Sequence, residues 1–143
     1  MNPFAFAACL GVAVVLACAV ARADDAQTLP IDEPTTINGI EVACTGVGDD
    51  ANTDPRWPQY PVRIEFANAN AEYLADLDIT ISDARGGVLF TVRCDSPWFL
   101  AKLPPGKYMV AGTFEERLTK TAKFTAPARG QARIIVRFPE VTG

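Results

Sequence analysis

The 143-residue chain contains no histidine. Without an imidazole the chain cannot build a Ser-His-Asp or Cys-His catalytic centre, and it cannot hold zinc through histidine ligands. The commonest routes to hydrolysis and to metal-assisted chemistry are therefore excluded. We expect a protein that is not an enzyme, with no catalytic, cofactor-binding or metal-binding residues and no cofactor.

Positive charge is also scarce. Thirteen Lys and Arg residues stand against 17 Asp and Glu residues, which gives a formal net charge of −4. Nucleic acids and anionic membrane surfaces both need a basic patch on their protein partner. We therefore expect no nucleic-acid partner. No apolar segment after residue 23 is long enough to span a membrane, so we expect no stable membrane insertion of the mature chain.

The first 23 residues are typical of a cleavable signal peptide. Nearly every residue from Phe4 to Val20 is apolar or small, and Ala21-Arg22-Ala23 fits a small-x-small cleavage site. No Lys or Arg precedes the apolar run, so an uncleaved anchor is an alternative. A second alternative is lipidation at Cys18, which follows Val15-Leu16-Ala17. The main prediction is cleavage after Ala23 and a periplasmic or secreted protein.

Cysteine is limited to four residues, and two of them, Cys9 and Cys18, lie in the predicted signal peptide. Cys44 and Cys94 remain in the mature chain. An even pair in an oxidising compartment predicts a disulfide. The alternative is two separate buried thiols.

The mature chain divides into an irregular segment, a strand-rich domain and a short tail. Residues 24–58 carry four prolines and have strand character only from Ile37 to Cys44. Residues 59–139 alternate between apolar and polar positions, which is typical of half-buried strands, and 140–143 form the tail. Turn residues separate seven predicted strands, at about 60–67, 76–83, 87–94, 98–103, 107–114, 118–125 and 131–138. This pattern predicts an all-β fold, a sandwich or barrel.

The alternation also predicts which side chains face the core. The inward residues share one face of each strand; they are Val62, Ile64, Phe66, Leu77, Ile79, Ile81, Val88, Phe90, Val92, Tyr108, Val110, Phe114, Phe124, Ile134, Val136 and Phe138.

The segment from Leu103 to Val110, Leu-Pro-Pro-Gly-Lys-Tyr-Met-Val, resembles an element of carboxypeptidase regulatory-like, transthyretin-like (prealbumin-like) β-sandwich domains. Residues 73–76, 83–87 and 97–100 are also similar to small exported bacterial proteins of this type. The resemblance covers about residues 36–139 and implies a seven-stranded Greek-key β-sandwich after the signal peptide. Such domains are often accessory or stand-alone exported modules. Fold similarity by itself implies no chemistry.

Acidic residues give two weak candidates for chemistry. Asp50, Asn52 and Asp54 have the spacing of a calcium loop, but prolines stand where an EF-hand needs glycine and glutamate. Asp76 and Asp78 lie two apart on a predicted strand and would share a face, as an acid–base pair requires. A solvated acidic loop and exposed surface charge are the alternative interpretations.

Aromatic and basic residues give two candidates for binding. Trp57 and Trp98 could stack on sugars, although Trp98 beside two apolar residues is more typical of a core, and Trp57 of packing over one end of the sandwich. The side chains of four arginines are predicted to point outward and could form a basic stripe: Arg63, Arg93, Arg133 and Arg137. Scattered surface charge is the alternative, because only the order of the strands in the sheets decides whether these four side chains lie together.

These patterns favour an exported non-catalytic binding or interaction module of the periplasm or cell envelope. Its partner would be an envelope protein or a polysaccharide. A structural protein that adds partner strands to an exposed sheet edge is the alternative. An enzyme based on carboxylates is the third interpretation, and a pocket with convergent carboxylates would favour it.

Overall fold

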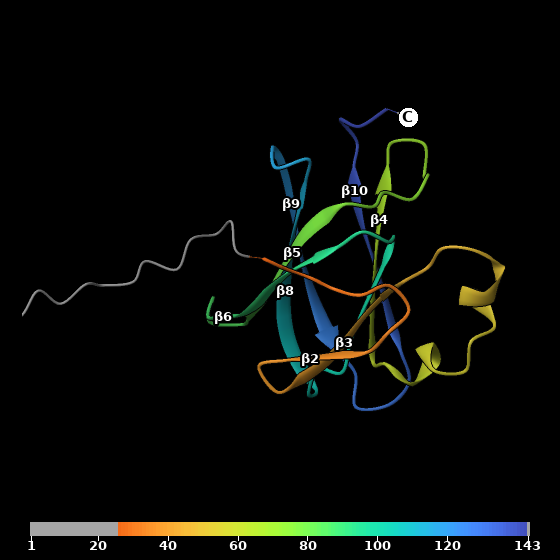
Figure 1. Ribbon diagram of the computed structural model, residues 1–143. Helices are drawn as coiled ribbons and strands as arrows, with labels where there is room; N and C mark the ends of the chain where they lie inside the picture. Colours follow the sequence, from red (N-terminus) through yellow and green to blue (C-terminus); the bar gives the residue numbers. More distant parts are fainter. Residues whose placement is uncertain (1–25, 143) are drawn as a thin grey trace, which may run out of the picture.

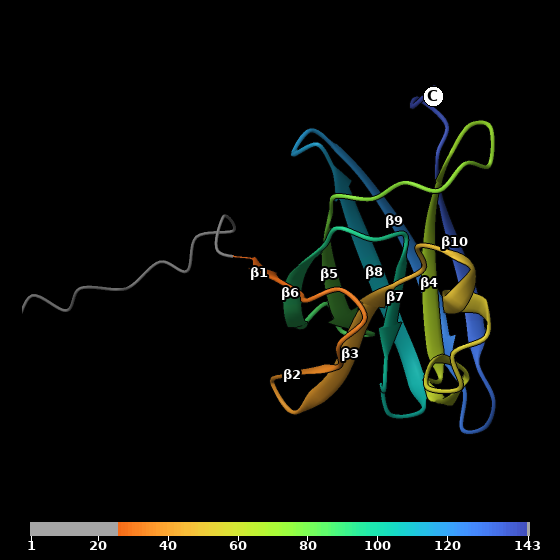
Figure 2. The same ribbon diagram turned by 45° about the vertical axis from the view of Figure 1, so that its right-hand side comes forward.

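The computed structural model describes residues 26–142, and this part of the chain is all-β. Two five-stranded sheets stack face to face (Figure 1, Figure 2). Sheet 1 has the order β1-β6-β5-β8-β9, and sheet 2 has the order β10-β4-β7-β3-β2. The strands are β1 (Gln27–Thr28), β2 (Thr35–Ile37), β3 (Ile40–Thr45), β4 (Val62–Asn68), β5 (Leu77–Asp83), β6 (Val88–Cys94), β7 (Trp98–Ala101), β8 (Gly106–Phe114), β9 (Leu118–Ala126) and β10 (Ala132–Phe138).

Two short 3₁₀ helices, η1 (Asp49–Asn52) and η2 (Trp57–Gln59), lie in the connection between β3 and β4. Among residues 26–142 there is no helix of the length and apolar character that a membrane crossing requires. The predicted signal peptide, and with it the alternative lipidation at Cys18, lies outside the described residues.

The prediction of seven strands is wrong, because the sandwich has ten. All seven predicted strands are present, with ends within two residues of the predicted ones. The other three come from residues 24–58, which were predicted to be irregular with one short strand. β1 pairs with β6 in sheet 1, whereas β2 and β3 extend sheet 2. β1 and β2 have only two and three residues and depend on backbone hydrogen bonds to a neighbour, so they leave no periodic pattern in the sequence.

The inner faces of the two sheets form one apolar core, largely from the residues that the alternation predicts. Tyr108, Phe114 and Ile134 are only partly buried against it. Val88 was predicted to face inward but is 62% exposed. The register of β5 and β6 shifts between Ile81, which pairs with Phe90, and Ser82, which pairs with Val88, so Leu89 is an extra residue that interrupts the side-chain alternation. A β-bulge of this kind turns the next side chain away from the face that strict alternation assigns.

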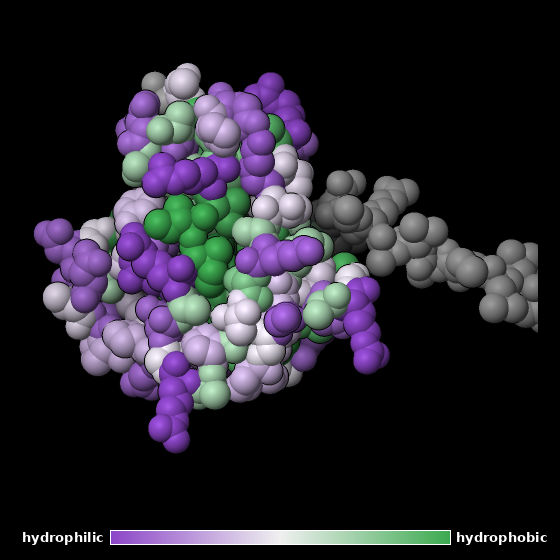
Figure 3. Space-filling view, turned by 180° about the vertical axis from the view of Figure 1, so that it is seen from behind, coloured by the Kyte–Doolittle hydropathy of each residue, from purple (hydrophilic) through white to green (hydrophobic). Residues whose placement is uncertain are grey.

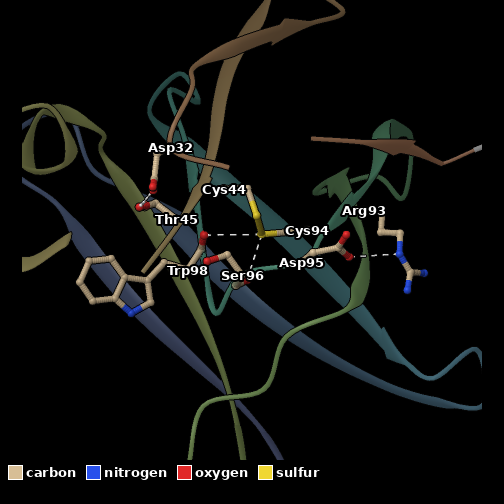
Figure 4. Close-up of a disulfide and its surroundings, with 8 residues drawn as sticks. All are labelled: Asp32, Cys44, Thr45, Arg93, Cys94, Asp95, Ser96 and Trp98. Atoms are coloured by element: carbon tan, nitrogen blue, oxygen red, sulfur yellow. Dashed lines mark hydrogen bonds and ion pairs between the residues drawn. A yellow bond between two sulfur atoms is a disulfide. The ribbon is translucent and has the colours of Figure 1, made fainter. Parts of the chain in front are cut away.

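A disulfide joins the two sheets through the core. Cys44 lies on β3 of sheet 2 and Cys94 ends β6 of sheet 1 (Figure 4). Their Cα atoms are 5.6 Å apart and their sulfur atoms 2.02 Å apart. This meets the requirement that bridged Cα atoms lie within about 7 Å. Beside it, the Thr45 hydroxyl donates a hydrogen bond of 2.6 Å to the Asp32 carboxylate, which ties the first residues of the described chain to β3.

The outer face of sheet 2 is partly covered as well. Trp57 and Tyr60, from the β3–β4 connection, pack against Ala43 of β3 and Leu100 of β7 in a second apolar cluster. All four residues of β7 are consequently buried. The part of this outer face that remains accessible lies over β4 and β10.

Candidate functional site

The outward side chains of β4 and β10 meet because these strands pair in parallel. Their register places Arg133 beside Arg63, Ile135 beside Glu65, and Arg137 beside Ala67. Alternate residues of the same strands point into the core, so these six share the outer face of sheet 2. Glu65 and Arg133, 68 residues apart in the sequence, thus belong to one surface.

Glu65 is the centre of this surface, and its side chain is fully buried. Arg63 Nη2 donates to Glu65 Oε1 at 3.0 Å, and Arg133 Nη2 donates to the same oxygen at 3.3 Å. Arg133 Nε also pairs with Glu65 Oε2. A buried carboxylate is costly unless it is paired and hydrogen-bonded, and two guanidinium groups meet that demand here.

Two opposing effects act on the pKa of Glu65. Burial alone raises the pKa, because it disfavours the charged form. Hydrogen bonds from Arg133, Tyr73 and Arg63 act the other way and leave the pKa of Glu65 below its ordinary value. Glu65 is therefore a carboxylate at neutral pH, which suits it to hold arginines in place and not to transfer protons.

Arg63 is held on a second side by Trp98. The Arg63 guanidinium carbon lies 3.4 Å from the centroid of the Trp98 ring, within the range of a cation–π contact. Trp98 itself is 3% exposed. Burial of Trp98 was the favoured prediction, but the ring packs on the outer face of sheet 2 and not between the sheets. Neither Trp98 nor Trp57, which is also 3% exposed, offers a ring surface to a sugar.

Gly46 makes the close packing of Trp98 possible. Its φ is +111°, and a Cβ at this position would lie 2.5 Å from Cγ of Trp98. We expect Gly46→Ala to lower the free energy of unfolding by about 2 kcal/mol, through strain and overpacking. Gly39→Ala, in the two-residue turn between β2 and β3, is the matched control: φ is +80°, but no atom lies within 4 Å of the added Cβ, so we expect about 1 kcal/mol. Urea unfolding followed by tryptophan fluorescence measures both, and equal losses would contradict the contact with Trp98.

Four accessible side chains surround the buried Glu65. Tyr73 is 51% exposed and Ile135 is 42% exposed. The side chain of Arg133 is 54% exposed, and Arg137 is exposed too. Tyr73 belongs to this surface because its backbone bridges Ala67 at the end of β4. We call Tyr73, Arg133, Ile135 and Arg137 the β4–β10 patch.

Three of the four arginines predicted to form a basic stripe are therefore brought together, and the fourth is not. Arg93 lies on β6 of sheet 1, where its guanidinium pairs with Asp78 at 3.4 Å and with Asp95 at 3.2 Å. Only strand order could decide this grouping, because β4 and β10 belong to sheet 2 and β6 to sheet 1.

The predicted pairing of Asp76 with Asp78 on one strand face is wrong. Asp78 lies on β5, but Asp76 precedes the strand with φ at +60°. Partial desolvation raises the pKa of Asp76, and the neighbouring carboxylate of Asp95 raises it further. Asp78 is instead engaged by Arg93. The two carboxylates thus have different partners and do not form an acid–base pair with each other.

The acidic segment from Asp50 to Asp54 has a local partner. Arg56 binds Asp54 through Nε and Nη2, with Nη2 2.6 Å from Oδ2, and this pairing lowers the pKa of the Asp54 carboxyl. Arg56 also lies 4.3 Å from the centroid of the Trp57 ring. Within residues 26–142 no three His, Cys, Asp or Glu side chains are grouped so that they could hold a metal ion.

Sequence reasoning missed Glu65 and Tyr73. Glu65 alternates with Ile64 and Phe66, so it reads as an ordinary exposed strand residue. Its burial depends on Arg133 of a distant strand and on Trp98 of the neighbouring strand. Tyr73 lies in the connection between β4 and β5, where no pattern assigns a face.

No protein-family model and no curated protein matches the chain. The function is therefore argued from the chain's own surfaces.

Proposed function

We propose that this chain is an exported, non-catalytic binding module of the periplasm or cell envelope, and that it binds a partner protein through the β4–β10 patch. The observation that carries the proposal is the combination of exposed Tyr73, Arg133, Ile135 and Arg137 around one buried carboxylate. Tyrosine and arginine are enriched in protein interfaces and among the residues that contribute most to binding.

Preorganisation supports this assignment. Glu65 holds the guanidinium groups of Arg63 and Arg133 in place. The exposed side chain of Arg133 therefore loses less conformational entropy when a partner binds. The patch has two exposed cations beside two apolar side chains, which suits a partner with acidic and apolar residues. The Cys44–Cys94 disulfide supports export, because disulfides persist in oxidising compartments.

We propose further that the sandwich is of the transthyretin-like, carboxypeptidase regulatory-like kind. The supporting feature is the segment that leads from β7 into β8. There the Tyr108 hydroxyl donates a hydrogen bond of 2.7 Å to the carbonyl oxygen of Pro104, so the Pro-Pro-Gly turn and the strand that follows it are joined.

Site-specific photocrosslinking tests the binding function. A photoreactive phenylalanine derivative is placed at Ile135, or at Val88 as a matched exposed position on the other sheet. In cells that export the protein, we expect one discrete adduct from position 135 and none from position 88. Arg137→Glu should abolish the adduct, whereas Arg129→Glu, an exposed cation in the β9–β10 connection, should not. Equal adducts from both positions, no adduct, or indifference to Arg137→Glu would refute the proposal.

Strand addition is the second candidate function, and one observation favours it. Figure 3 shows hydrophobic side chains gathered in a hollow on the side where β9 and β10 lie, ringed by hydrophilic ones. Leu118, Ala122 and Ile134 of these strands are only partly buried. β9 and β10 are the long edges of their sheets, and they lie near each other. An adduct from a photoreactive residue at Thr121 of β9 that persists in Arg137→Glu would favour strand addition.

A further inference from the structure

The lysines and arginines of this chain divide into paired and unpaired groups. Of the twelve between residues 26 and 142, seven form ion pairs with acidic side chains: Arg56, Arg63, Arg93, Lys102, Arg117, Lys120 and Arg133. Among the described residues the other five cations have no acidic side chain within ion-pair distance, although acidic residues outnumber basic ones in the chain. Three of the remaining five, Arg85, Lys107 and Lys123, line one groove.

The groove lies at the end of sheet 1 where β8 begins and β9 ends. Its wall is the β5–β6 turn, residues 83–86, and its floor is formed by residues 107–109 of β8 and 123–125 of β9. Its volume is about 700 Å³. Volumes of about 300–1,000 Å³ are typical of sites for small organic ligands.

The strand register brings two of the cations together. Lys107 pairs with Thr125, and Met109 pairs with Lys123, so the two lysines are diagonal neighbours on adjacent strands. Such neighbours lie about 7–8 Å apart, within reach of long side chains. Like charges at this spacing repel each other, and an anion bound between them would relieve the repulsion.

The groove is also lined by one carboxylate, Asp83, and one phenol, Tyr108, so three cations stand there against one acidic group. Oδ1 of Asp83 accepts hydrogen bonds of 2.9 Å from the backbone N–H groups of Arg85 and Gly87, so this carboxylate holds the turn. The Tyr108 hydroxyl donates to Pro104. The ring of Tyr108 stacks on Phe124 with centroids 5.8 Å apart on the core side of the two strands, opposite the face that carries the two lysines.

We propose that this groove binds an anionic oligosaccharide, with carboxylate or sulfate groups on successive sugar units. The three cations would pair with the anionic groups, and the Thr125 hydroxyl can hydrogen-bond to sugar hydroxyls. The length of the groove over two strands and a turn suits several linked units better than one small anion. The site shares no residue with the β4–β10 patch, so it stands apart from the proposed protein-binding function.

Isothermal titration calorimetry of the exported protein with tetragalacturonate at low ionic strength tests the proposal. We expect binding that weakens about tenfold or more in Lys107→Gln/Lys123→Gln, which corresponds to about 1.4 kcal/mol. Arg117→Gln/Arg129→Gln changes the net charge by the same amount at exposed positions outside the groove, and should change the affinity less than about twofold.

Two further titrants separate the possible ligands. Maltotetraose, which is neutral, should not bind, and inorganic phosphate should bind far more weakly than tetragalacturonate. The proposal is overturned if tetragalacturonate does not bind, if phosphate binds as tightly, or if both double variants lose affinity equally. In the last case the effect would come from net charge alone. Matching thermal melting curves for the wild type and both variants show that neither loss reflects unfolding.

Discussion

Replacing Cys44 and Cys94 together by serine is expected to lower the free energy of unfolding by about 4 kcal/mol, according to the chain-entropy estimate for a loop of this length. The bond closes a loop with a sequence separation of 50 residues, so its loss frees a large part of the unfolded chain. It also joins β3 of sheet 2 to β6 of sheet 1 across the core. We expect the amino-terminal strands to separate first when the bond is absent.

Urea unfolding of the wild type and the double variant measures this loss. The reduced wild type is the matched control, because it lacks the bond without any substitution, and it should resemble the double variant. Thiol counting on denatured, unreduced protein provides the chemical test. No reactive thiol is expected from Cys44 or Cys94, and two reactive thiols would show that the bond does not form.

Replacing Glu65 by glutamine should cost about 3 kcal/mol at pH 7, the lower end of the range for breaking a buried ion pair. Arg63, whose side chain is only 20% exposed, would lose the carboxylate it binds while still confined against Trp98. Arg133 would lose less, because its side chain is 54% exposed and can turn to water. Glu33→Gln is the matched control, since Glu33 is exposed and should change stability little.

The cost of Glu65→Gln should also depend on pH. The pKa of Glu65 is lowered in the folded protein from an ordinary value of 4.5. A lowered pKa adds stability above the unfolded value, and this stability is lost as the pH falls through the folded value. The difference between wild type and Glu65→Gln should therefore be largest near neutral pH and shrink below pH 4.5. A difference that stays constant from pH 7 to pH 3 would contradict the ion-pair network.

The same network links stability to the proposed binding surface. Glu65→Gln removes the group that orients Arg133, yet it leaves Tyr73, Ile135 and Arg137 in place. The crosslink from position 135 should therefore weaken in Glu65→Gln but persist at low yield. Complete independence of the crosslink from Glu65 would mean that Arg133 needs no preorganisation to bind.

The alternation of apolar and polar residues was enough to predict the strands between residues 62 and 138 and most of the core. Except for β7, these strands turn one face into the core, and a period of two is the direct consequence. β7, whose four residues are all buried, shows no such period and is bounded by turn residues instead. The pairing of Cys44 with Cys94 could be predicted from counting alone, because only two cysteines follow the predicted signal peptide.

Tertiary structure decided strands β1 and β2, the interrupted face at Val88 and how the residues of both proposed sites come together. β1 and β2 are too short to show a period, and they exist because β6 and β3 offer backbone partners. The β4–β10 patch depends on the parallel register that sets Ile135 beside Glu65, and the groove depends on the register of Lys107 and Lys123. β4 and β10 are far apart in the sequence, and no local pattern encodes their pairing. Lys107 and Lys123 lie in one hairpin, so only the approach of the β5–β6 turn with Arg85 to that hairpin depends on tertiary structure.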